Sequence, residues 1–311
     1  MLLRKNLKKI LAEKLKALNK LRPLSPELVA KLKEKFEIEM TYNSNAIEGN
    51  TLTLKETGLV LQHGITVKGK PLKDHLEAKN HKEALLFLYD LVDENERFTF
   101  GEYMIKSLHS LVVKESNASI AGHYRDVDVF ITGSDHKPPS ALDVPSEMEK
   151  LVQWANENFK RMNIIEFSAI LHHKFVHIHP FNDGNGRTGR LIMNIFLMHH
   201  GFPLAIIQKN DRSKYYNALS LADTGKYKTL VNFIGQAVLR SVNLYLDVLM
   251  PAFQKEKWIS LAEAAKPYTY SQAYLSKLAK EGKIDAHKQG RNWVTTKEAM
   301  ERYVNSLKRF D

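Results

Sequence analysis

Cysteine and long apolar runs are both missing from this sequence. Among its 311 residues there is no cysteine, which excludes a disulfide framework and thiolate chemistry. No apolar run approaches the roughly 20 residues that a membrane-spanning helix requires, and no apolar signal core follows the N-terminal lysines. These absences predict a cytoplasmic protein without membrane association. The length predicts one large domain or two smaller ones.

Acidic residues are scarce at the two ends of the chain. Residues 1–35 hold 11 Lys/Arg against 3 Asp/Glu, and residues 256–311 hold 11 against 7, whereas residues 36–255 hold 24 against 25. The net charge of +11 therefore lies at the ends. Leucines at helical spacing predict a basic amphipathic helix over Leu2–Leu21. We favour a solvated lysine face there over a nucleic-acid or membrane contact.

The most informative stretch is His179–Arg190, which lies between two apolar segments with helical spacing, Ile164–Ile178 and Leu191–Met198. Pro180 must end the first helix because it lacks an N–H and restricts the residue before it. The loop that follows leads onto the N-terminus of the second helix. Free N–H groups and the helix dipole make such a terminus an anion-binding site.

Side chains in this loop provide the other parts of a nucleotidyl-transfer site. Asp183 is a hard oxygen ligand suited to Mg²⁺, and His179 can act as a general base at neutral pH. Arg187 and Arg190 are three residues apart, so they share a helix face and can neutralise phosphate charge. Phe181 is expected to anchor the loop in the core. No Gly-Lys-Ser/Thr follows, so the loop is not a P-loop.

The string His-Pro-Phe-Asn-Asp-Gly-Asn-Gly-Arg-Thr-Gly-Arg over residues 179–190 is similar to the signature of the Fic family at every fixed position. Fic enzymes typically transfer AMP from ATP to a protein hydroxyl and release pyrophosphate. The resemblance covers about residues 40–250 and implies a mostly α-helical Fic bundle. It also implies ATP as co-substrate with Mg²⁺ on Asp183, catalysis by His179, Arg187 and Arg190, and nucleotide contacts from Gly184, Asn185, Gly186, Arg187 and Arg190.

A second informative stretch, residues 41–50, contains Ser44-x-x-x-Glu48-Gly49. In a helix, Ser44 and Glu48 lie one turn apart on one face, and Gly49 ends the turn. By itself such a string is usually only a helix end. It resembles the inhibitory segment of Fic proteins, in which the glutamate pairs with the second signature arginine, here Arg190. The resemblance implies that Glu48 occupies the place of the γ-phosphate and restrains catalysis.

Two more segments correspond to Fic features. Val127–Thr132 alternates apolar and polar residues, which predicts a short strand in a hairpin over about residues 125–140. This hairpin resembles the Fic flap, which pairs with an extended segment of the protein substrate; a connecting hairpin without a binding role is the alternative. Tyr216 and Asp223 align with residues beside the nucleotide base in the family, whereas core packing is at least as good an interpretation for Tyr215.

Four histidines offer an alternative zinc interpretation: His172, His173, His177 and His179. His173 and His177 lie one helical turn apart, but the sequence supplies no third ligand in a recognisable pattern. We therefore assign His179 to catalysis and the others to core and helix-end packing.

The C-terminal residues follow Pro251 and a charged run at 254–257, which together predict a domain boundary. Expected helices over 259–265, 270–281 and 297–307, with a hairpin turning at 289–292, resemble a winged helix-turn-helix. Such a module could bind DNA through residues 256–311, or dock a protein or a second copy of the chain to form a homodimer.

The sequence thus predicts three parts: a basic helical arm (1–35), a mostly α-helical Fic domain with a β-hairpin flap (36–252), and a small winged-helix domain (253–311). We expect a protein adenylyltransferase that modifies a Ser, Thr or Tyr hydroxyl of a partner or of the protein itself. The alternatives are removal of AMP, transfer of another phosphate-containing group, and a DNA-binding regulator that only senses nucleotide.

Overall fold

The computed structural model describes residues 2–93, 99–131, 134–249 and 257–307. The chain forms two compact units, one from Lys33–Val231 and the other from Met1–Leu32 with Asn232–Asp311. The predicted boundary around residues 251–257 lies almost wholly outside the described residues. The division into 1–35, 36–252 and 253–311 therefore stays a prediction.

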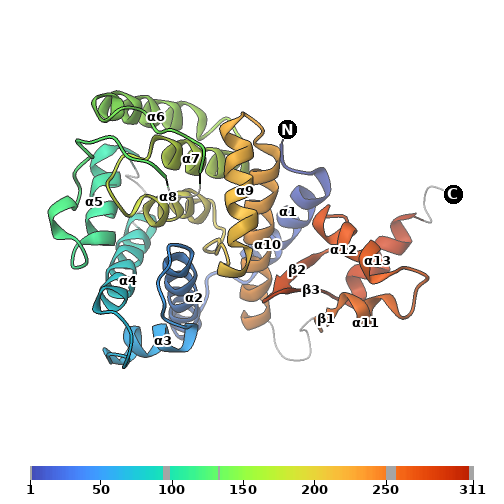
Figure 1. Cartoon of the computed structure of the whole chain (residues 1–311). Coiled ribbons are helices and arrows are strands. Elements are labelled where there is room, and N and C mark those ends of the chain that lie inside the picture. The colour runs from blue at the N-terminus through green and yellow to red at the C-terminus, as the bar shows by residue number, and fades with distance from the viewer. Residues whose placement is uncertain (1, 94–98, 132–133, 250–256, 308–311) are drawn as a thin grey trace. The chain divides into compact units, whose positions relative to one another are not determined.

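Helices make up most of the larger unit (Figure 1). The two helices predicted on either side of residues 179–190 are both present, among the helices between residues 26 and 249. Their bounds are α2 (Pro26–Ile47), α3 (Leu54–His63), α4 (Leu72–Asp93), α5 (Glu102–Val113), α6 (Val144–Asn158), α7 (Ile164–Ile178), α8 (Asn185–His199), α9 (Arg212–Asp223) and α10 (Lys228–Leu249). The two unit boundaries fall within α2 and α10, so the start of α2 and most of α10, from Asn232 on, belong to the smaller unit.

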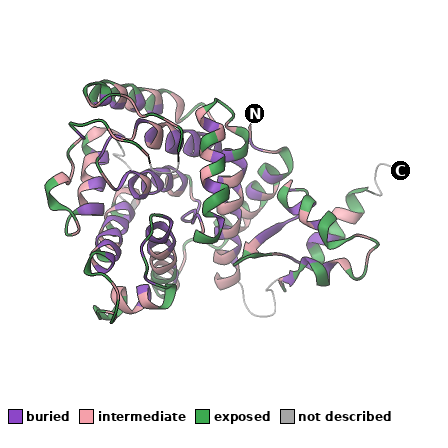
Figure 2. Cartoon of the chain, in the orientation of Figure 1, coloured by how far each residue is buried: buried purple, intermediate pink, exposed green. Residues whose placement is uncertain are grey.

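The centre of this unit is the helix pair α7 and α8. Asn163 begins α7 as an N-cap, with its side chain accepting the N–H groups of Ile165 and Glu166. Most residues of both helices are buried, as the purple segments of Figure 2 show. The helices approach closely at Gly189, where a Cβ would meet Phe175 at 3.0 Å. Because both helices are fixed by the core, the loop between them has fixed ends.

The predicted strand at Val127–Thr132 is wrong for the described residues 126–131, none of which is in a strand. Thr132 and Gly133 lie outside the described residues. In place of a partner strand, the buried side chain of Arg125 donates hydrogen bonds to the carbonyls of Val127 and Pro139. The segment is therefore held at its base by one arginine side chain rather than by a β-ladder.

The smaller unit contains α1 (Lys5–Lys20), which buries Leu7, Leu11 and Leu18. Its C-terminal elements are β1 (Ile259–Ser260), α11 (Leu261–Ala265), α12 (Gln272–Lys280), β2 (Ala286–Gln289), β3 (Asn292–Thr295) and α13 (Lys297–Leu307). The strands form an antiparallel sheet of order β1-β3-β2. Gln289 and Asn292, expected in the turn, pair with each other at its edge.

The first two C-terminal helices each have a local start signal. Ser260 and Ser271 accept the N–H groups of Glu263 and Tyr274, which caps α11 and α12. A small apolar core forms beneath them, including Leu275, Leu278 and Met300. Among the helices of the described residues, none combines the length and apolarity that crossing a bilayer requires.

Candidate active site

His179 lies directly after α7 and has a left-handed backbone, with φ 51° and ψ 58°. Within the described ranges it is the only non-glycine residue at positive φ. This conformation costs about 1–2 kcal/mol. The chain is held there because the His179 carbonyl accepts Nε–H of Arg125 at 2.9 Å and the Pro180 carbonyl accepts the Arg125 N–H at 2.9 Å. Arg125 therefore fixes both the histidine and the base of the 126–140 segment.

The surroundings of the His179 imidazole favour its neutral form. Burial lowers its pKa below the usual 6.5, and the charge of Arg125 lowers it further. The Val176 carbonyl and the Glu48 carboxylate act in the opposite direction but do not outweigh burial. At neutral pH the imidazole is therefore available to accept a proton.

The loop after His179 is held in place by the packing of Phe181 and the hydrogen bonds of Asn185. Phe181 is fully buried and stacks on His109, with ring centroids 3.6 Å apart, which confirms its expected place in the core. Asn185 accepts the N–H of Phe181 at 2.9 Å and donates to its carbonyl at 2.7 Å. The side-chain amide of Asn185 is therefore used within the loop, and its predicted nucleotide contact stays a prediction for the backbone N–H.

Asp183 and Gly184 form the turn into α8. Asp183 Oδ1 accepts the N–H of Gly184 at 2.6 Å, and Gly184 caps the helix with φ 77°. A Cβ at residue 184 would also meet Val113 at 3.0 Å, so this position requires glycine on both grounds. Burial raises the pKa of the Asp183 carboxyl, but Arg187, the Gly184 N–H and Lys73 together lower it below its usual value. The side chain is 45% exposed, so an ionised oxygen ligand faces solvent.

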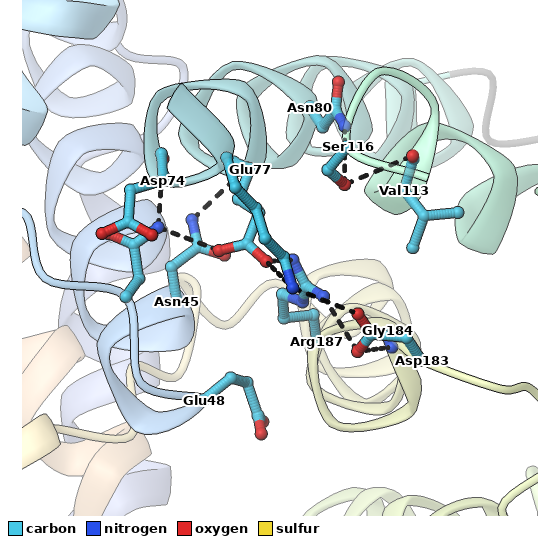
Figure 3. A network of polar contacts seen from close by, with 12 residues as sticks. Asn45, Glu48, Asp74, Glu77, Asn80, Val113, Ser116, Asp183, Gly184 and Arg187 are labelled. Atoms are coloured by element: carbon cyan, nitrogen blue, oxygen red, sulfur yellow. Dashed lines mark hydrogen bonds and ion pairs between the residues drawn. The ribbon is translucent and has the colours of Figure 1, made fainter. Parts of the chain in front are cut away.

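Arg187 lies between two carboxylates (Figure 3). Its side chain is 1% exposed, with Nη1 3.2 Å from Glu77 Oε1 and Nη2 3.2 Å from Asp183 Oδ1. Glu77 comes from α4 and also accepts a hydrogen bond from Asn50 at 3.0 Å. Glu77 of α4 therefore holds the Arg187 guanidinium beside Asp183 in the loop over residues 179–184.

Arg190 is bound by the end of α2. Its side chain donates to Ser44 Oγ at 3.0 Å, to the Ser44 carbonyl at 2.7 Å and to Glu48 Oε1 at 2.8 Å. Burial lowers the pKa of Arg190, but Glu48 together with Tyr215 and Tyr216 raises it above its usual value. A Cβ at Gly186 would collide with the Glu48 carboxylate. The Ser44–Glu48 segment thus lies against the first turn of α8.

Glu48 is held in place by the turn that ends α2. Gly49 has φ 102°, and the N–H of Asn50 bonds to the Asn45 carbonyl at 3.1 Å. The Ile47 carbonyl accepts Nε–H of Arg212 at 2.7 Å. Glycine is needed at position 49 because other residues rarely adopt this conformation.

Comparison with known proteins places this site in a family. The Fic/DOC family model matches residues 99–197. A Fic domain containing signaling protein from Bacteroides thetaiotaomicron is 31% identical, with a TM-score of 0.71 over 79% of this chain and 97% of that one. The chain belongs to the Fic/DOC family.

Two animal relatives extend this comparison. Fic-1 from C. elegans is 31% identical, with a TM-score of 0.69 over 78% of this chain and 71% of that one. The Nematostella vectensis protein named Protein adenylyltransferase Fic is 35% identical over 76% of this chain. The chain spans 60% of the length of that curated relative.

The two residues predicted on the adenine side of this Fic domain both lie on α9. Tyr216 is half-buried and stacks against Arg212, whose guanidinium carbon is 4.7 Å from the ring centroid. Asp223 Oδ1 lies 2.9 Å from His173 Nε2 and 2.9 Å from His177 Nδ1. Tyr215, by contrast, is buried and bonds His172 at 2.6 Å, so it belongs to the core.

Three polar residues of the Fic site were missed by sequence reasoning. Glu77 positions Arg187, Arg125 fixes His179, and His109 Nε2 lies 3.0 Å from the Asp183 carbonyl. Burial lowers the pKa of His109 to about 4, so it stays neutral and donates this bond. Each is a single charged or polar residue within a helix or loop, and no local pattern distinguishes it from a surface residue.

Proposed function

We propose that this protein is a protein adenylyltransferase. The observation that carries the proposal is the position of a neutral His179 beside the N-terminus of α8, with Arg187 and Arg190 on its first two turns. A helix N-terminus with two arginines accepts a polyphosphate, and the adjacent imidazole accepts a hydroxyl proton. The curated relative named above carries the same activity in its name.

The proposed reaction has one displacement at the α-phosphorus of ATP. His179 takes the proton of a Ser, Thr or Tyr hydroxyl while that oxygen forms a bond to the α-phosphorus. The bond from the α-phosphorus to the bridging oxygen of the β-phosphate breaks, and pyrophosphate leaves. Arg187 and Arg190 hold the β- and γ-phosphates and neutralise the charge that develops on pyrophosphate.

Asp183 fits a magnesium ligand. It is a partly exposed carboxylate with a lowered pKa, next to the predicted phosphate position. Mg²⁺ prefers such hard oxygen ligands, and when bound it would neutralise part of the negative charge of the phosphates.

A labelling experiment tests the transfer. Wild-type protein is incubated with ATP labelled at either the α- or the γ-phosphate, and label on protein is measured, with the modified residue located by mass spectrometry. Retention from α-labelled ATP alone is the expected result. His179→Ala should lower that labelling by about 10²–10⁴-fold with an unchanged unfolding midpoint. Label from γ-labelled ATP, or full activity in His179→Ala, contradicts the proposal.

Autoinhibition by Glu48 is part of the same proposal. Its carboxylate takes a hydrogen bond from Arg190 that a γ-phosphate would otherwise take. In the alternative reaction, removal of AMP, the same carboxylate would position a water molecule. Loss of label from pre-modified protein after wild-type protein is added would reveal this reaction.

The segment over 126–140 is the proposed binding site for the protein substrate. Val127 and Phe130 are 56% and 87% exposed, and the described residues 126–131 have no strand partner. An extended substrate segment could add a strand there and bring its hydroxyl to His179.

The C-terminal elements fit a winged helix in order and length. DNA binding by them is a separate proposal, supported by the exposed Lys277, Lys280 and Arg291. Gel-shift of duplex DNA by the full chain, weakened by added salt, is its test. Unchanged migration of the DNA at low salt would contradict DNA binding. The remaining interpretation would be that these elements dock a protein or a second copy of the chain.

A further inference from the structure

The helix end that carries Glu48 is bound by the part of the chain around the start of α9. The Ile47 carbonyl accepts Nε–H of Arg212 at 2.7 Å. Just before α9, the N–H of Lys209 donates to Asn43 Oδ1 at 2.9 Å, and Asn43 is buried. These two contacts reach α2 at positions one helical turn apart.

Arg212 completes the hydrogen bonding at the C-terminal end of α2. The last four carbonyls of an α-helix have no partner within the helix. In α2 the first three, at residues 44–46, accept hydrogen bonds from Arg190 and from N–H groups of the following turn. The fourth, that of Ile47, accepts one from Arg212, which lies 165 residues further along the chain. The helix dipole also favours a positive charge at this end.

This contact acts on the peptide unit that joins Ile47 to Glu48. The N–H of that unit, on Glu48, donates to the Asn45 carbonyl at 3.0 Å, and its carbonyl is the one that Arg212 holds. Both polar groups of one planar unit are therefore bonded, one within α2 and one from α9. The backbone of Glu48 is thereby fixed where its side chain reaches Arg190 at 2.8 Å.

The Arg212 side chain is held on the surface of the protein. The residue is exposed, and its guanidinium carbon lies 4.7 Å from the ring centroid of Tyr216, one turn further along α9. A substitution at an exposed position leaves neither a cavity nor a buried charge. Replacing Arg212 therefore changes the contact with α2 without disturbing the core.

We propose that Arg212 is a positioning residue that keeps Glu48 in its inhibitory place, and that weakening this contact activates the enzyme. The inference rests on the proposed transferase activity and on the proposed inhibition by Glu48. Without the bond from Arg212, the Ile47 carbonyl turns to water and the last turn of α2 opens more often. Each opening frees Arg190 to bind phosphate, so the population of the active state rises.

Labelling of protein with α-labelled ATP tests this role on the full chain. Arg212→Gln should raise the labelling rate by about threefold or more, but by less than Glu48→Gly does. Arg212→Lys, which keeps the charge and a donor, should stay closer to wild type. In the double variant with Arg212→Gln and Glu48→Gly, the rate should equal that of Glu48→Gly, because no inhibitory carboxylate remains to be positioned.

Lys214→Gln is the matched control for the loss of charge. It removes a positive charge from the same turn of α9, at a side chain that is 63% exposed and pairs with Asp211 at 3.0 Å. It should label protein as wild type does.

Hydrogen exchange gives a second readout that does not depend on activity. The N–H groups of Glu48 and Asn50 both donate to the Asn45 carbonyl, and they should exchange faster in Arg212→Gln than in wild type or Lys214→Gln. Unchanged exchange or an unchanged labelling rate in Arg212→Gln overturns the proposal. A double variant slower than Glu48→Gly overturns it as well, because Arg212 would then contribute to transfer directly.

The outcomes separate this inference from the function on which it rests. A gain in Glu48→Gly without a gain in Arg212→Gln refutes the role of Arg212 alone. No labelling by wild type or by Glu48→Gly refutes the transferase, and the role of Arg212 in its inhibition falls with it.

Discussion

At the scale of single residues, each signature arginine is paired with a carboxylate from a distant part of the chain. Arg187 lies against Glu77, and Arg190 lies against Glu48. A buried guanidinium without a counter-charge is costly, so the protein supplies an anion where the proposed substrate would supply phosphate. The carboxylates therefore balance the buried positive charge, and under the proposed inhibition Glu48 would also compete with the nucleotide.

We expect Glu77→Gln to lower the free energy of unfolding by about 3 kcal/mol, because it leaves the buried Arg187 charge without its α4 partner. The side chains of this pair are 9% and 1% exposed. Urea unfolding of the two proteins measures the difference.

Glu115→Gln is the control for that change. Glu115 pairs with Lys79 at 2.8 Å, but the two side chains are 29% and 57% exposed, so its loss should cost less than about 1 kcal/mol. Equal losses for the two variants would show that Arg187 does not need Glu77.

At the scale of elements, the turn that ends α2 carries Glu48, the carboxylate proposed to inhibit the enzyme. Gly49 provides the left-handed conformation that ends the turn, and Arg212 binds the Ile47 carbonyl. Glu48 reaches Arg190 only because this turn is held at the first turn of α8. The proposed inhibition thus depends on the conformation of a helix end as well as on one side chain.

Replacing Glu48 with glycine should raise the rate of label transfer from α-labelled ATP by about tenfold or more, which corresponds to about 1.4 kcal/mol. The physical reason is that Arg190 becomes free to bind phosphate. Glu48→Gln, which keeps the volume but removes the charge, should give a smaller increase.

Glu27→Gly places a glycine in the first turn of α2, at an exposed position, and controls for helix flexibility. It should transfer label as wild type does. An unchanged or lower rate in Glu48→Gly would contradict the inhibitory role.

At the scale of the whole molecule, several histidines are buried in neutral form. Burial lowers the pKa of His81 and His172 in the larger unit, and of His287 in the smaller unit, to about 3 in each case. Nearby arginines lower these values further. Since the unfolded chain binds these protons near pH 6.5, acid favours unfolding.

The stability from these histidines is therefore complete above pH 6.5 and is lost as the pH falls toward 3. Each should contribute on the order of 2 kcal/mol to the loss between pH 7 and pH 5. Urea unfolding at the two pH values measures the loss. His81→Gln should reduce the difference between them, whereas exposed His123→Gln should not; equal pH dependence in all three proteins would refute the assignment.

The local parts of the site could be predicted from the sequence because they depend on neighbouring residues. Pro180, Gly184 and the two arginines specify a helix end, a turn and a helix start within residues 179–190. The helices on either side of this loop also followed from the local spacing of apolar residues. The expected strand at 127–131 failed because alternation gives an extended chain but does not provide a partner for its backbone.

By itself the sequence determined an anion-binding helix terminus with a histidine beside it, since dihedral preferences and helix dipoles act over a few residues. Only the tertiary structure decided which groups face that terminus. Glu48 and Arg190 are 142 residues apart in the chain, and His136 meets His177 across 41. Such pairs depend on the packing of whole helices, which buries apolar faces and thereby fixes the charged residues that those helices carry.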